Sequence, residues 1–398
     1  MQNAAPPTVS TPAVSLPAAE RELRIDLFRG LALWLIFIDH LSPDLLTWFT
    51  IRNYGFCDAA EIFIFISGYT AAFVYGRAMR ESGFLIATVR ILRRVWQIYV
   101  AHVFIVIIFL GEIEYAVTSS ENPFFSQEMR VVDFIQHPGT VLLQTLLLRF
   151  RPLNIDVLPL YVVLMFFLPV ILWLMKWKAD VALALSVAFY VLTLHYDWYL
   201  TAYPSGYWAF NPFGWQMLFV FGAWCALGGA RRLSGFLASP VSLWISVAYL
   251  VAAFFVTLTW YFPQLEPLLP RLLVQWMYPI DKTNMDILRF GYFLALAAIT
   301  VRFVPKGWPG LQSPWLRPLI LCGTHSLEIF CLGVFLAFAG YFVLVELNGG
   351  FGLHFLVAVA GILIMSGVAW VNSWYKRTDD KTARIGGTGG NADIVGGR

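Results

Sequence analysis

The sequence predicts an all-α, polytopic helical membrane protein with about ten transmembrane helices. Hydrophobic residues make up 59% of its 398 residues and charged residues only 13%, whereas soluble domains carry about 25% charged residues. The apolar residues form continuous blocks of about 20, which is the length that spans a hydrocarbon core. Because the blocks do not alternate apolar and polar residues, the pattern argues against a β-barrel.

Ten blocks have the composition of membrane spans. They are residues 27–46, 57–77, 92–111, 156–176, 179–195, 213–230, 241–262, 286–304, 326–346 and 352–374. A further apolar stretch at 127–149 is interrupted by Pro138 and Gly139, so we predict an interfacial or re-entrant helix there.

The two ends of the chain have a different composition from the predicted membrane domain at 21–376. Residues 1–20 lack the basic start and apolar run of a signal peptide and predict a disordered cytoplasmic leader. Residues 377–398 are rich in glycine and predict a disordered cytoplasmic tail.

Basic residues in the predicted loops indicate the orientation, because cytoplasmic loops of membrane proteins carry an excess of Lys and Arg. With ten spans, the basic clusters beside the spans all fall on one side, and Glu112, Glu114, Glu121 and Glu128 fall on the other. Both termini are therefore predicted to be cytoplasmic.

The first span carries ionisable residues near both ends of an apolar run, "FRGLALWLIFIDH". Arg29 and His40 are 11 residues apart, which is about three helical turns or roughly 16 Å, so both side chains lie on nearly one face. Asp26 lies on the same stripe and can pair with Arg29. Ionisable residues inside a membrane indicate function. The alternatives are a structural hydrogen-bonding role for His40 and an interfacial anchor for Arg29.

The second span opens with two acids, Asp58 and Glu61, on one helix face. Small residues continue near that face and favour close helix packing: Gly68, Ala72 and Gly76. We therefore expect span two to bring its carboxylates against span one. A carboxylate beside His40 would orient the imidazole and raise its basicity. Alternatively, both acids lie in the outer headgroup layer.

Several blocks resemble the OpgC family, whose founding activity is succinylation of osmoregulated periplasmic glucans. They are "RIDLFRGLALWLIFIDH", "FCDAAEIFIFISGYTAAFVYG", "NIDVLPLYVVLM", "DKTNMDILRFGYFLALA" and "GTHSLEIFCLGVFL", and the similarity runs from about residue 21 to 376. The family resembles a branch of a larger group of transmembrane acyltransferases that includes O-antigen acetylases and the lysosomal heparan acetyltransferase. In that group an arginine and a histidine separated by ten residues recur in the first span, as Arg29 and His40 are here.

The resemblance implies an O-acyltransferase of the bacterial inner membrane. The donor would be cytoplasmic acyl-CoA, here succinyl-CoA, and the acceptor a hydroxyl of a periplasmic glucan. By this resemblance His40 is catalytic, as a general base or as a nucleophile. We favour the base, with Asp39, Asp58 or Glu61 setting its tautomer. Transfer of acetyl to another surface glycan or lipid-linked sugar, and transport of a glycan or small molecule, stay open as alternatives.

Arginines on the predicted cytoplasmic side are candidates for binding the CoA phosphates. They are Arg29, Arg77, Arg90, Arg93 and Arg94. Ordinary positive-inside bias also explains the last three. His325 in "GTHSLE" either lines the CoA entrance or caps a helix.

The acceptor side offers residues 195–215, which contain four Tyr, three Trp and two Phe. Such rings suit sugar faces, although an interfacial aromatic belt gives the same composition. The candidates for substrate binding are Trp198, Tyr207, Trp208, Lys282, Asn284, Arg289 and Arg151. Lys282 or Arg289 would hold a carboxylate of the acyl group or pair with Asp286.

Other chemistries lack their motifs. The sequence contains no Gly-x-Ser-x-Gly elbow, P-loop, dinucleotide fingerprint or paired Cys/His metal motif. The four cysteines read as small apolar residues, so we expect neither disulfides nor a metal. A net charge of +3 gives no indication of nucleic-acid binding. A homo-oligomer is compatible with the sequence.

Overall fold

The computed structural model describes residues 22–41, 46–119, 134, 136–150, 152 and 155–388 of the chain. Within these ranges the secondary structure is helical, apart from two isolated β-bridges. The α-helices are α1 (Leu23–Leu41), α2 (Ala59–Glu81), α3 (Gly83–Ser119), α6 (Pro138–Leu146), α7 (Val157–Tyr196), α8 (Pro212–Trp224), α9 (Ala230–Ala238), α10 (Pro240–Tyr261), α11 (Arg271–Met277), α12 (Ile287–Phe303), α13 (Arg317–Thr324), α14 (Ser326–Glu346) and α15 (Phe351–Thr388).

Seven helices or helix runs in the described part of the chain are long and apolar enough to cross a membrane. They involve α2, α3, α7, α8 with α9, α10, α14 and α15. This confirms the predicted all-α, multi-pass membrane class. The other predicted spans overlap α1 and α12, and two predicted spans fall within the single long helix α7.

Helix α7 is a hairpin of two arms. Its backbone leaves the helical region at Lys178, where φ is −151° and ψ is 108°. Beyond the two ends of α7, Phe150 and Tyr203 form a β-bridge, and the Tyr203 amide donates to the Arg149 carbonyl at 2.9 Å. Because both ends of α7 return to one place, its arms run antiparallel, as two separate spans at 156–176 and 179–195 would.

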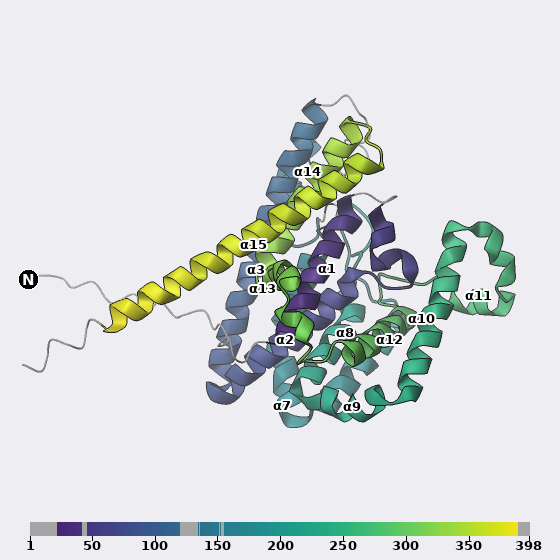
Figure 1. Ribbon diagram of the computed structural model, residues 1–398, viewed down its shortest axis with the longest axis horizontal. Helices are drawn as coiled ribbons and strands as arrows, with labels where there is room; N and C mark the ends of the chain where they lie inside the picture. The colour runs from purple at the N-terminus through teal and green to yellow at the C-terminus, as the bar shows by residue number, and fades with distance from the viewer. Residues whose placement is uncertain are drawn as a thin grey trace, which may run out of the picture.

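Helix α1 lies within the bundle and packs against α13, α14 and α2 (Figure 1). Its buried face includes Leu33 and Phe37, which are almost fully covered. The contact with α13 is close because Gly30 and Gly323 bring the two backbones together, and a Cβ at either position would overlap a carbonyl of the other helix. Glycine at both positions therefore fixes the position of α1, which carries Arg29 and His40.

Gly68 of α2 packs against α8 and Gly76 lies beside Leu172 of α7, so neither glycine of the predicted stripe faces the first span. A Cβ on Gly68 would overlap the Phe219 carbonyl, and a Cβ on Gly222 of α8 would overlap the Phe65 carbonyl. The two glycines thus allow reciprocal backbone contact between α2 and α8. Helices α2 and α8 approach closely because glycine on both of them leaves no side chain between the two backbones.

Several basic residues that the sequence places on one side meet at one end of the bundle. Arg24 donates to the Val304 carbonyl at 3.1 Å, and Arg302 donates to the Ala238 carbonyl at 2.8 Å. Lys306 pairs with Glu22 at 2.9 Å. The start of α1 therefore lies beside the end of α12, while His40 lies at the other end of α1. We call the first the basic end and the second the His40 end.

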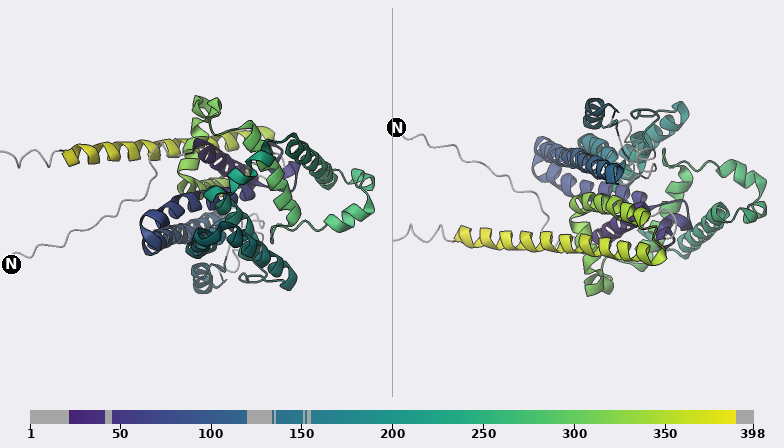
Figure 2. Two further views of the ribbon diagram at one scale, coloured as in Figure 1. Left: turned by 90° about the horizontal axis from the view of Figure 1, so that it is seen from below. Right: turned by 90° about the horizontal axis from the view of Figure 1, so that it is seen from above.

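Helix α15 projects from the bundle as a long single rod, which the two perpendicular views also show (Figure 2). It continues to Thr388, so part of the stretch predicted as a tail, residues 377–388, is helical. Helix α6 starts at Pro138, because proline suits the first position of a helix. The leader at 1–20, the first part of the 127–149 stretch, and residues 389–398 lie outside the described residues.

Candidate functional site

His40 is a half-buried residue in the last turn of α1, at the His40 end of the bundle. The charged groups that act on its imidazole are Lys282, Asp58 and Arg52, and the carbonyl of Ile36 lies beside it. These charges come from three separate segments of the chain. The structure therefore brings His40 within electrostatic range of Asp58, one of the two predicted span-two carboxylates.

Asp58 and Glu61 form a capping box at the start of α2. The Asp58 carboxylate accepts from the Ala60 amide at 2.8 Å, and the Asp58 amide donates to Oε2 of Glu61 at 3.0 Å. Both interactions satisfy amides at the helix start that have no partner within the helix. The sequence signal for this cap is an acid followed three residues later by a glutamate.

Two cations from outside α2 neutralise these acids. Arg289 donates from Nε to Oε1 of Glu61 at 2.9 Å, and its Nη2 bonds the same oxygen. Lys282 forms an ion pair with Asp58, and Arg289 lies 3.7 Å from the same carboxylate. Glu61 is fully buried. Because Arg289 and the Asp58 amide already occupy both of its oxygens, the role of Glu61 in this arrangement is structural, while Asp58 is the acid that acts on His40.

Neither cation pairs with Asp286 as one alternative had it. The Asp286 carboxylate instead accepts from the Leu288 amide at 2.7 Å and caps α12. This cap sets the start of α12 and hence the position of Arg289 three residues later. The two cations differ in exposure, because Arg289 is 10% exposed and Lys282 is 44% exposed. Only Lys282 retains substantial access to a ligand.

A network of two asparagines fixes the loop that carries Lys282. Asn211 donates to the side-chain oxygen of Asn284 at 2.8 Å and to the Trp198 carbonyl at 2.7 Å. Asn284 donates to the Tyr199 hydroxyl at 2.7 Å and to Asp281 at 2.8 Å. Asn284 is buried, so this predicted substrate-binding residue acts on the loop and not at its surface.

The aromatic loop at 195–215 divides into exposed and buried rings. Trp198 and Tyr207 are exposed, whereas Trp208 is 4% exposed. The Trp198 ring stacks on Tyr196 with centroids 5.7 Å apart, and Tyr207 lies 5.0 Å from Tyr199. Trp198 and Tyr207 therefore present faces to which a sugar can stack. Arg151 lies outside the described residues.

Asp39 precedes His40 in α1 and lies beside Thr50. Its Oδ1 is buried and accepts no hydrogen bond from the residues that the structure describes. Such an oxygen is costly to bury unless a further group binds it. Asp58, which acts on the His40 imidazole, and Asp39, its neighbour in sequence, are thus the two candidate orienting acids, and Glu61 belongs to the neighbouring ion pair.

Arg29, three turns before His40, is turned toward α2. Its Nη2 donates to the Ile66 carbonyl at 3.3 Å and also bonds the Thr70 hydroxyl. Sequence reasoning did not single out Thr70, whose only signal is a hydroxyl near the middle of an apolar span. Both partners belong to α2, so Arg29 lies between helices and not at a lipid surface.

The remaining arginines of the predicted CoA site lie on α2 and α3. Arg77 pairs with Glu81 one turn later at 2.7 Å, and Arg94 donates to Gln97 at 3.2 Å. Arg90 is half-buried and Arg93 is exposed. These two contacts join residues of the same helix, as expected on the basic side of a membrane protein.

His325 is buried between α13 and α14. Its Nε2 lies 2.9 Å from the Ser373 hydroxyl, and its Nδ1 lies 3.5 Å from the Lys376 amine, both on α15. It occupies the cap position of α14 without a side-chain capping bond. The structure thus uses this imidazole to join α15 to the α13–α14 junction.

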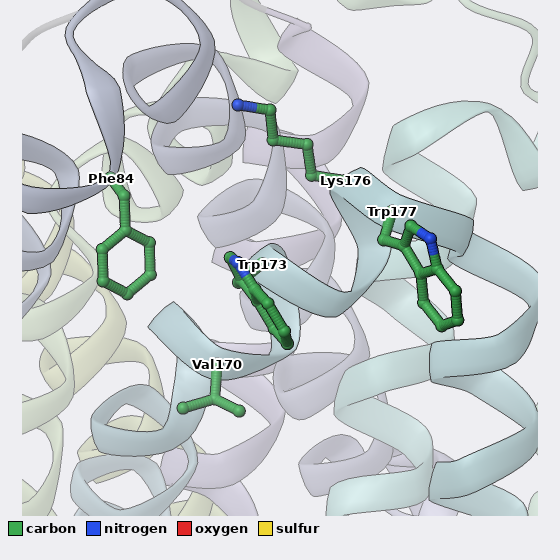
Figure 3. A pocket seen from close by; sticks show the side chains of 5 residues that line it. All are labelled: Phe84, Val170, Trp173, Lys176 and Trp177. Carbon is green, nitrogen blue, oxygen red and sulfur yellow. The ribbon is translucent and has the colours of Figure 1, made fainter.

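An open groove of about 670 Å³ lies near the turn of the α7 hairpin (Figure 3). Phe84 of α3 and Val170, Trp173, Lys176 and Trp177 of α7 line it. This mostly apolar lining is typical of a surface that contacts lipid chains. The groove belongs to the basic end and is separate from the His40 residues.

Among the described residues, no cluster of three or more His, Cys, Asp or Glu has the geometry of a metal site.

Comparison with known proteins connects this site to a family. A search of curated proteins found no match, and neither did a search of solved structures. The family model described as OpgC protein matches residues 21–377, which include every helix from α1 to α14 and most of α15. The match covers well over half of the chain, and the helices are those of a multi-pass membrane protein. The chain belongs to the OpgC family and is a membrane protein of the acyltransferase type.

Proposed function

We propose that this protein is an O-acyltransferase of the bacterial inner membrane. It transfers a succinyl group from cytoplasmic succinyl-CoA to a hydroxyl of a periplasmic glucan. The observation that carries the proposal is the position of His40. In a chain of the OpgC family, this ionisable side chain ends α1 in a half-buried position, beside Asp58 and Lys282.

His40 is the general base in this reaction. Its imidazole takes the proton of the glucan hydroxyl while that oxygen attacks the thioester carbonyl. The carbon–sulfur bond then breaks, and the imidazolium returns the proton to the leaving CoA sulfur. The products are a glucan ester and CoA with a free thiol. Asp58 and Asp39 favour the charged imidazolium that forms between the two steps.

Donor and acceptor approach His40 from opposite ends of α1. Arg29 and the arginines of α2 and α3 lie on the predicted cytoplasmic side, and their guanidinium groups suit the phosphates of CoA. The exposed rings of Trp198 and Tyr207 lie in the loop that the Asn211–Asn284 network joins to Lys282. These rings receive the glucan on the periplasmic side.

Reconstitution tests the proposal. The full-length protein is placed in vesicles and supplied with succinyl-CoA that carries a label in the succinyl group, together with periplasmic glucan. The expected product is glucan with an alkali-labile succinyl ester, identified by mass spectrometry. Vesicles without protein are the control. Glucan that crosses the vesicle membrane without gaining an ester would instead identify a carrier, and failure to transfer any acyl group would overturn the proposal.

The same assay separates the acyltransferase alternatives. Acetyl-CoA in place of succinyl-CoA measures acetyl transfer, and a lipid-linked sugar in place of glucan measures the other class of acceptor. Ester formation only with these substrates would keep the enzyme class and replace the proposed substrates.

A further inference from the structure

Arg52 is an exposed cation that sequence reasoning did not single out. It lies in the short helix η3 (Ile51–Tyr54), between α1 and α2. Within the described part of the chain it makes no hydrogen bond and no ion pair, although it acts electrostatically on His40 and Asp39. Because this exposed arginine has no ion pair among the described residues and lies near a candidate catalytic histidine, it is available to a ligand.

The turn that carries Arg52 is fixed on both sides. Asn53, the next residue, is 2% exposed, donates to the Thr47 hydroxyl at 3.0 Å and accepts from the Tyr261 hydroxyl at 2.6 Å. The Tyr261 ring also lies 4.8 Å from the ring of Trp48. A rigid turn holds the base of the Arg52 side chain near the end of α1, so binding a ligand costs little ordering of the backbone.

Lys282 is the second accessible cation near His40. Its ammonium is paired with Asp58 and lies 5.0 Å from the centre of the Phe210 ring. Its backbone carbonyl accepts from the Trp215 indole at 3.0 Å, which fixes the loop. Arg52 and Lys282 come from different segments, and both act on the same imidazole. Two cations thus lie near the candidate reaction centre.

We propose that Arg52, assisted by Lys282, binds the free carboxylate of a dicarboxylic acyl group and makes the site select succinyl over acetyl donors. The inference rests on the proposed acyl transfer and assigns its donor specificity. Guanidinium groups bind carboxylates through two parallel hydrogen bonds. In a succinyl thioester the free carboxylate is separated from the reacting carbonyl by two methylenes, or roughly 4 Å.

The direction of donor entry places that carboxylate at the His40 end. In this proposal CoA enters from the basic end, so the free end of the acyl group lies beyond the thioester, on the side away from the CoA phosphates. This end then points toward the turn of Arg52 and the loop of Lys282. An acetyl group has no carboxylate to offer these cations. Arg289 is not suited to this role because Glu61 already holds it in a buried pair.

Donor competition with matched variants tests the inference. Initial rates are measured with succinyl-CoA and acetyl-CoA for wild type, Arg52→Gln, Arg52→Lys and Arg271→Gln. Arg271 is an exposed cation of α11 and serves as the matched control. We expect Arg52→Gln to lower kcat/KM for succinyl-CoA by roughly 10- to 100-fold, the range for loss of a charged hydrogen bond. The loss with acetyl-CoA is expected to be much smaller, Arg52→Lys keeps part of the preference, and Arg271→Gln leaves both rates unchanged.

Three outcomes would overturn the assignment. They are equal losses for both donors in Arg52→Gln, no loss for either donor, and a wild type that shows no preference for succinyl-CoA. Each leaves acyl transfer itself in place. A wild type that transfers neither group would contradict the proposed function instead, so the two failures are distinguishable.

Discussion

Arg289 donates from both Nε and Nη2 to one carboxylate oxygen of Glu61, across 228 residues of sequence. The pair joins the start of α12 to the start of α2. The other oxygen of Glu61 accepts from the Asp58 amide, so the same carboxylate also caps α2. Asp58, and through it Lys282, are placed by this buried pair. Glu61 is therefore a positioning residue for the groups around His40.

Breaking this pair should destabilise the protein strongly. Glu61→Gln removes the closer counter-charge of the buried Arg289 guanidinium and leaves only the Asp58 carboxylate at 3.7 Å, and removal of one partner of a buried ion pair costs about 3–5 kcal/mol. We expect a clearly lower unfolding temperature of the detergent-solubilised protein. The double variant Glu61→Gln, Arg289→Met should recover part of the loss. Glu81→Gln, which breaks the exposed pair with Arg77, is the control and should change little. Equal stability of Glu61→Gln and wild type would contradict the structural role.

Replacement of His40 should abolish transfer without unfolding the protein. The side chain is half-buried at a helix end, so His40→Ala is expected to reach the membrane and to unfold near the wild-type temperature. General base catalysis contributes roughly 100- to 10,000-fold, and the rate of glucan ester formation should fall by that factor. His354→Ala, which removes a histidine that lies 3.1 Å from the Gly350 carbonyl at the start of its own helix, is the matched control. Wild-type turnover in His40→Ala would refute the base assignment.

The contact between α2 and α8 should not tolerate a side chain at Gly68. Valine there places atoms on the Phe219 carbonyl, and overpacking of this kind costs about 1–3 kcal/mol. We expect Gly68→Val to lower the unfolding temperature and the yield of folded protein. Gly111→Ala is the control because no described atom lies within 4 Å of a Cβ added there, and alanine favours the helix by up to about 1 kcal/mol. If both variants unfold alike, the close approach of α2 and α8 is wrong.

The buried contact between His325 and Ser373 separates two roles of His325. Ser373→Ala removes the partner of a buried ring nitrogen, which costs about 1–3 kcal/mol. Because both ring nitrogens face α15, we expect a lower unfolding temperature and an unchanged KM for acyl-CoA. Thr300→Ala removes a hydroxyl that donates to the Leu296 carbonyl of its own helix at 2.8 Å and serves as the control. A raised KM without a loss of stability would instead favour a role of His325 at the CoA entrance.

The sequence by itself determined the membrane class, the positions of the helices and the alignment of Arg29 with His40. These properties are local, because span length depends on continuous apolar composition and alignment depends on helical period. Even the two arms of α7 follow from the interruption of hydrophobicity near Lys178. The same local reasoning placed Asp58 and Glu61 on one helix face, where they form a capping box.

Only the tertiary structure decided which groups meet. The sequence predicted Glu61 as a candidate acid for His40, but in the structure Glu61 pairs with Arg289. Asp58 is the acid that acts on the imidazole. The stripe with Gly68 packs on α8 because Gly222 opposes it. Arg52 has no motif, and its place depends on a turn held by Tyr261 of a distant helix. Pairings between segments far apart in the chain are set by backbone approach and burial, which no local pattern encodes.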